Sequence, residues 1–93
     1  MKKFLVYISQ SAREQFSSFE PSMQKRLKKS MQNLSINPFS SHSGCDIKKL
    51  NGNLIPPLYR LRVGDARALY SVQGTEVKIT EIIKRKEGYN FLD

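Results

Sequence analysis

The feature that most constrains this chain is an alternating run of side chains at residues 58–63. Apolar residues alternate there with two arginines, so a β-strand places both arginines on one face. Gly64-Asp65 follows and suits a two-residue type II′ turn, because glycine supplies the positive φ angle. In the resulting hairpin, Arg67 lies opposite Arg62. The sequence therefore predicts an antiparallel hairpin with three arginines on one face: Arg60, Arg62 and Arg67.

These three residues, which we call the arginine face, indicate an anionic ligand. Like charges directly opposite each other destabilise a sheet by up to ~1 kcal/mol. Arginine is always charged, and its planar guanidinium group binds phosphate through two parallel hydrogen bonds. The alternative is a solvated sheet face that carries its charges outward, as half-exposed antiparallel sheets commonly do.

The elements on either side of the hairpin predict the rest of the fold. A strand at residues 4–8 precedes a helix with a capping box, formed by Ser11 and Glu14. Pro21 opens a second helix, whose apolar stripe ends at Leu34. A loop at residues 37–46 leads to four strands, at residues 47–50, 58–63, 66–72 and 77–84.

This β-α-α-β-β-β-β order predicts an α+β fold, with two N-terminal helices packed on one face of a small antiparallel sheet. A chain of 93 residues has room for one domain, so we expect residues 1–93 to form a single domain. The single cysteine, Cys45, excludes an internal disulfide and a cysteine-based zinc cluster. His42 has no second histidine beside it, so we expect no metal and no cofactor.

The net charge of +8 limits the classes of partner. Residues 48–86 carry nine bases and three acids, which is +6 of that charge. Nucleic acid, an acidic protein or an anionic membrane surface can each supply the counter-charge. No apolar run approaches the ~20 residues that cross a bilayer, and the short apolar start lacks a cleavage site. We therefore expect a cytoplasmic protein with no membrane partner.

Two further basic clusters are candidates for contact with RNA. Lys84, Arg85 and Lys86 lie close to Tyr89, and basic residues beside aromatic rings suit RNA because the rings stack on unpaired bases. The alternative is a solubilising strand end with the tyrosine packed on the core. The second cluster falls largely off the apolar stripe of the second helix and is either a solvated face or a contact to nucleic-acid backbone: Lys25, Arg26, Lys28 and Lys29.

Three segments together resemble the RelE/ParE toxin superfamily of prokaryotic toxin–antitoxin modules. They are Lys48-Lys49-Leu50-Asn51-Gly52, the arginine hairpin from Tyr59 to Tyr70, and Ile82-Ile83-Lys84-Arg85. The resemblance covers nearly the whole chain, with Ala66 at a position where the superfamily usually has an aromatic residue. It implies the same β-α-α-β-β-β-β fold.

The resemblance implies two activities. RelE-like toxins enter the ribosomal A site and cut mRNA, whereas ParE-like toxins inhibit DNA gyrase without the RNase residues. We expect a type II toxin that is a ribosome-dependent mRNA endoribonuclease and inhibits translation. The alternative is a non-catalytic ParE-like gyrase inhibitor or an inactive relative. The implied partners are a cognate acidic antitoxin, the ribosome and mRNA.

By resemblance, the active positions are Arg60, Arg62, Arg67, Arg85 and Tyr89. In a RelE-like reaction a ribose 2′-OH attacks the adjacent phosphate and leaves a 2′,3′-cyclic phosphate. Arg67 and Arg85 would stabilise the charge on that phosphate, and Tyr89 would stack on the nucleotide. The RNA-binding candidates are Lys48, Lys49, Lys84, Lys86, Lys25, Arg26, Lys28 and Lys29.

The general base of this reaction must be a residue other than an arginine. The best-known RelE toxins place lysines at the positions of Arg60 and Arg62, and arginine stays protonated at neutral pH. A lysine crowded by other cations has a lowered pKa, which makes Lys48, Lys49 or Lys84 a candidate base. Alternatively, positioning and charge stabilisation supply most of the rate.

Overall fold

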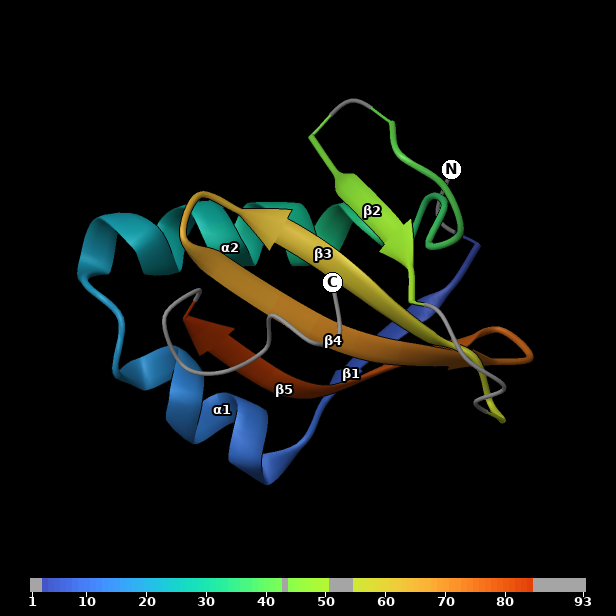
Figure 1. Cartoon of the computed structure of the whole chain (residues 1–93), viewed down its shortest axis with the longest axis horizontal. Coiled ribbons are helices and arrows are strands. Elements are labelled where there is room, and N and C mark those ends of the chain that lie inside the picture. Colours follow the sequence, from blue (N-terminus) through green and yellow to red (C-terminus); the bar gives the residue numbers. More distant parts are fainter. Residues whose placement is uncertain (1–2, 43, 51–54, 85–93) are drawn as a thin grey trace.

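The order of elements along the chain follows the predicted pattern. The computed structural model describes residues 3–42, 44–50 and 55–84. The elements are β1 (Leu5–Ile8), α1 (Gln10–Ser17), α2 (Pro21–Asn33), β2 (Asp46–Lys49), β3 (Leu58–Val63), β4 (Ala66–Gln73) and β5 (Glu76–Lys84). The five strands form one sheet in the order β1-β5-β4-β3-β2 (Figure 1). The predicted α+β class is therefore confirmed.

The sheet is mixed, whereas the sequence predicted a wholly antiparallel sheet. β1 pairs parallel with β5, and the other neighbouring strands pair antiparallel. No hairpin fixes the direction of β1, because both helices and three strands separate it from its partner. Its register places Val6 beside Val77 and Ile8 beside Ile79, which adds its apolar residues to the helix-covered face.

The N-cap of helix α1 lies two residues before the predicted one at Ser11. Ser9 is the N-cap, and its hydroxyl oxygen accepts a hydrogen bond of 3.0 Å from the backbone N–H of Ala12. The same hydroxyl donates to the carbonyl of Thr80 in β5, also at 3.0 Å. The predicted cap at Ser11 is wrong, because Ser9 satisfies the helix end and ties it to the sheet at once.

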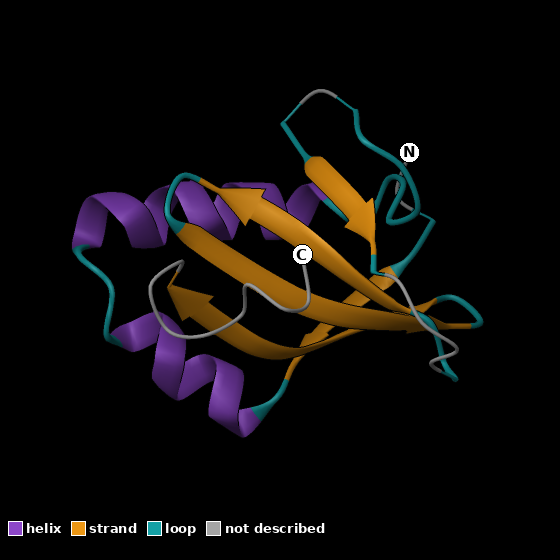
Figure 2. Cartoon of the chain, viewed as in Figure 1, coloured by secondary structure: helices purple, strands orange, loops and turns teal. Residues whose placement is uncertain are grey.

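Both helices pack on the same face of the sheet (Figure 2). Helix α2 begins at Pro21 as predicted and buries its apolar stripe through Leu27 and Met31. The C-cap Leu34 is also fully buried. The strand residues that meet this stripe in the core include Ile47, Leu61, Ala68, Tyr70, Val77, Ile79 and Ile82.

A β-bulge in β5 sets which of its side chains enter the core. Tyr70 pairs with Ile79, but the next residue back, Leu69, pairs with Glu81, so Thr80 is the extra residue. Because of this insertion, Ile79 and Ile82 both face the helices although three positions separate them. The loop before β5 has two residues, Gly74 and Thr75.

Candidate functional site

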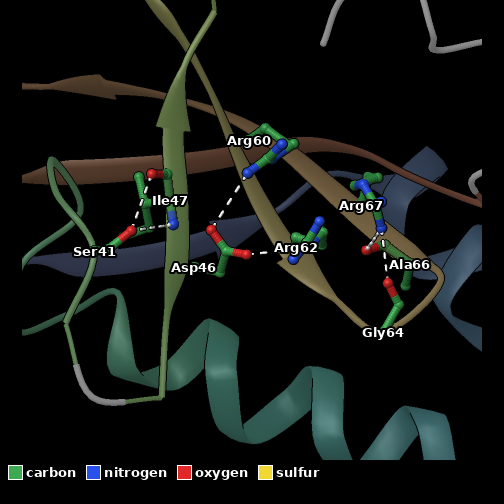
Figure 3. Close-up of polar contacts among 8 residues, drawn as sticks. All are labelled: Ser41, Asp46, Ile47, Arg60, Arg62, Gly64, Ala66 and Arg67. Carbon is green, nitrogen blue, oxygen red and sulfur yellow. Dashed lines mark hydrogen bonds and ion pairs between the residues drawn. The ribbon is translucent and has the colours of Figure 1, made fainter.

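The arginine hairpin has the predicted register. Gly64 has a positive φ of 56°, and only glycines have a positive φ in the described part of the chain. Val63 pairs with Ala66 and Arg62 with Arg67. Arg60 lies two residues along the same strand, so all three arginines lie on the face opposite the helices (Figure 3).

The three arginines differ in exposure, which their spacing did not predict. Arg62 has a side chain that is half exposed, but Arg60 is 7 % exposed and Arg67 only 3 %. The Nη1 of Arg67 donates to the backbone carbonyls of Gly64, at 2.8 Å, and Ala66, at 3.1 Å. Arg67 therefore braces the turn of its own hairpin.

Asp46 joins the two arginines of β3 from the neighbouring strand. It pairs in register with Arg62, and its carboxylate lies 3.0 Å from Nε of Arg62 and 3.4 Å from Nη2 of Arg60 (Figure 3). This carboxylate offsets the repulsion between the guanidinium groups. Asp46 was not predicted as a partner because the strand was expected to begin at Ile47. Alternation along the strand could have revealed it, because Ile47 faces the core and its neighbour Asp46 therefore faces the arginines.

A serine from the preceding loop bonds to the backbone of β2 next to Asp46. Ser41 lies beside Ile47 on β2 and bonds to both of its backbone groups. Its hydroxyl accepts from the N–H of Ile47 at 2.9 Å and donates to the carbonyl of Ile47 at 3.1 Å (Figure 3). These bonds fasten the preceding loop to β2, and Asp46 is the residue before the bonded position.

The predicted RNA-binding lysines of the strands divide between the two faces. Lys48 pairs with Arg60 and lies on the arginine face, whereas Lys49 pairs with Tyr59 on the other side. Lys84 pairs with Ala66 on the helix-covered side, and its Nζ lies 5.4 Å from the ring centroid of Phe19. Three predicted site residues, Arg85, Lys86 and Tyr89, lie outside the described residues.

Helix α2 brings two of its four predicted bases to the hairpin. All four bases are exposed, but only Arg26 and Lys29 line a groove of about 520 Å³ between α2 and the end of β3. Arg62, Asp46 and Gly64 line the same groove. It is therefore continuous with the arginine face through Arg62.

Two buried groups near this site are held in their protonated forms. Burial raises the pKa of the Cys45 thiol, which donates to the carbonyl of Ser30. Burial, with Cys45 and Tyr59 nearby, also raises the pKa of the Tyr70 phenol. That phenol donates to the carbonyl of Pro38 at 2.6 Å. Neither group is suited to act as a base or nucleophile at neutral pH.

Other kinds of site are absent from the part of the chain that the structure describes. Over residues 3–42, 44–50 and 55–84, no three His, Cys, Asp or Glu side chains come together as a metal site. Neither described helix has the length and apolar character needed to cross a membrane.

Comparison with known proteins gives a family and a fold. The family model for the ParE toxin of type II toxin–antitoxin systems matches residues 2–89. No curated protein matches the sequence.

Solved toxin–antitoxin complexes have the same fold. The archaeal RelE–RelB complex from Pyrococcus horikoshii contains a chain with 26 % identity and a TM-score of 0.77, covering 92 % of this chain and 99 % of its own. The RelBE2 complex of Mycobacterium tuberculosis has 22 % identity and a TM-score of 0.74, with 89 % and 99 % covered. The RelB–RelE complex of Methanococcus jannaschii has 23 % identity and a TM-score of 0.71, with 92 % and 98 % covered.

Proposed function

This chain belongs to the ParE toxin family of type II toxin–antitoxin systems, within the RelE/ParE superfamily, and from that membership we propose that it cleaves mRNA on the ribosome. The observation that supports this activity is the arginine face. Three guanidinium groups share one sheet face opposite the helices, and Arg62 presents a half-exposed side chain there. Such a face binds and polarises a phosphodiester.

The proposed reaction is an internal transfer at phosphorus. The 2′-oxygen of one ribose forms a bond to the adjacent phosphorus, and the bond from phosphorus to the 5′-oxygen breaks. A base takes the 2′-OH proton, and the departing 5′-oxygen receives a proton. The products are a 2′,3′-cyclic phosphate and a 5′-OH end.

Each arginine has a distinct role in this proposal. Arg62 binds the phosphate oxygens directly, because it is the most exposed of the three. Arg60 adds positive charge from beside it, and Arg67 keeps the hairpin rigid while contributing to the field at the phosphate. Arg85 and Tyr89, carried over by resemblance, complete the charge stabilisation and stack on the nucleotide.

Lys48 is the base that the geometry favours among the three candidate lysines. It lies on the arginine face in register with Arg60, whereas Lys49 and Lys84 lie on the opposite side of the sheet.

Programmed ribosomes with an mRNA of defined sequence test this proposal directly. We expect the chain to cut within the codon in the A site, leaving a 5′-OH end that a polynucleotide kinase phosphorylates directly and a 3′ end that cannot be extended until its cyclic phosphate is removed. Arg62→Ala should reduce the rate by ~10²–10³, as loss of a phosphate-stabilising group does. Arg13→Gln removes one charge from exposed α1 and should cleave at the wild-type rate. Intact mRNA with a folded chain would contradict the proposal.

Inhibition of DNA gyrase is the second candidate function. The specific observation in its favour is that the matching family model describes ParE toxins. The carboxylate of Asp46 also lowers the net charge of the arginine face. Inhibition of gyrase supercoiling by the purified chain, without mRNA cleavage, would establish this function in place of the first.

An acidic antitoxin is the proposed protein partner under either function. The chain carries +8, and opposite charge on the partner would accelerate association by electrostatic steering. The three solved structures described above are all toxin–antitoxin complexes. We propose that the antitoxin covers the arginine face.

A further inference from the structure

The groove beside the hairpin lies at a step in the edge of the sheet. β2 begins at Asp46, which pairs with Arg62, so within the described residues β2 does not extend alongside Val63 and Gly64. Helix α2 lies next to this step, and the space between them is the groove of about 520 Å³. In Figure 3 the Asp46–Arg62 pair lies above the ribbon of α2.

Positive charge from two elements meets in this groove. Arg26 and Lys29 come from α2 and Arg62 from β3, against the single carboxylate of Asp46. Arg26 reaches the turn itself, because a Cβ built on Gly64 would lie 3.2 Å from its Nη1. In the described part of the chain, neither Arg26 nor Lys29 forms an ion pair. The groove therefore has an excess of two positive charges.

The lining favours a phosphate backbone over a protein segment. Protein partners gain most of their affinity from apolar or aromatic anchors in pockets. The apolar side chains here are Val63 and Cys45, and both are buried. The other lining groups include the hydrogen-bonding side chains of Ser30, Asn33 and His42. Cations together with neutral polar groups are the usual contacts to nucleic-acid phosphates.

We propose that this edge groove binds a backbone phosphate of single-stranded RNA through Arg26 and Lys29, next to the phosphate on the arginine face. The carboxylate of Asp46 bridges Arg60 and Arg62 from the position that phosphate oxygens would take. It competes with RNA for Arg62 and so sets the affinity of the groove. This inference rests on the proposed function, because it takes RNA as the bound anion.

The number of phosphate contacts is measurable from the salt dependence of binding. We would titrate the full chain with a fluorescein-labelled 15-nucleotide RNA at several salt concentrations and follow anisotropy. For single strands, log K falls with log salt by about 0.7 per phosphate contact, so Arg26→Gln with Lys29→Gln, which removes the one phosphate contact proposed for the groove, should lower the slope by about 0.7. Lys25→Gln with Lys28→Gln removes the same charge from the same helix, outside the groove, and should change the slope by less than half as much as the groove pair.

Asp46→Asn tests the competing carboxylate. It removes the negative charge while keeping the size of the side chain, and we expect RNA to bind about fivefold more tightly, since exposed ion pairs are worth up to ~1 kcal/mol. Thermal unfolding of each variant would verify that it is folded. Weaker binding by folded Asp46→Asn would overturn the role of Asp46.

Two further outcomes would overturn the groove proposal. One is an equal loss of slope in the two double variants, which would mean that α2 acts only through its net charge. The other is groove-dependent binding of poly-glutamate in the absence of RNA binding, which would assign the groove to an acidic protein. RNA binding through the groove without mRNA cleavage would support this inference while refuting the proposed enzyme, so the two can fail separately.

Discussion

At the residue scale, the three arginines of one sheet face have three different environments. Arg62 is half exposed and ion-paired, Arg60 is buried beside the same carboxylate, and Arg67 is buried against the turn. Alternation in the sequence predicted their common face, because side chains alternate in any strand. It could not predict Asp46 as their partner, since that contact depends on which strand pairs with β3.

Because Arg67 braces the turn, replacing it should destabilise the chain more than replacing Arg62. Arg67→Ala removes two hydrogen bonds from a buried guanidinium group to the turn carbonyls. We expect the free energy of unfolding to fall by about 2–3 kcal/mol, because hydrogen bonds to charged groups are worth ~1.5–3 kcal/mol. Arg62→Ala removes a half-exposed ion pair and should cost less than ~1 kcal/mol. Urea unfolding followed by circular dichroism measures both, and equal losses would refute the brace.

At the scale of elements, the helices, the hairpin and the strand order along the chain were predictable from local patterns. Pro21 marks the start of α2, and Gly64 marks the turn, because each residue has a distinctive backbone preference. The parallel pairing of β1 and the bulge at Thr80 were not predictable, because both depend on contacts between distant segments. Ser9 was missed as the cap because the spacing of Ser11 and Glu14 matched a capping box, and the bond from Ser9 to β5 depends on the fold.

The two glycine turns allow a comparison of backbone strain with side-chain packing. Both glycines have positive φ, 56° at Gly64 and 61° at Gly74, so alanine is strained at either by about 1 kcal/mol. A Cβ at Gly64 would also lie 3.0 Å from the Cε of Met23, whereas a Cβ at Gly74 would meet nothing within 4 Å. Gly64→Ala should therefore destabilise the chain more than Gly74→Ala in the same urea measurement. The reverse order would show that the side-chain ends of Met23 and Arg26 move aside, so that packing adds nothing to the strain at Gly64.

At the scale of the whole molecule, charge and fold together determine the function that we propose. The net charge of +8 predicted an anionic partner, and the fold places part of that charge on one sheet face and in the groove beside it. The sequence could not predict the groove, which forms only because β2 is short and α2 packs near its end. The contributions of Arg85 and Tyr89 remain predictions from resemblance.

We propose that the arginine face cleaves mRNA during translation. The most direct test is induced expression in cells, with primer extension on a reporter mRNA for the wild-type chain, Arg62→Ala and Arg13→Gln. We expect breaks inside translated codons for the wild type and Arg13→Gln, and none for folded Arg62→Ala. Growth arrest by the wild type with intact mRNA, or unchanged cleavage by Arg62→Ala, would contradict it.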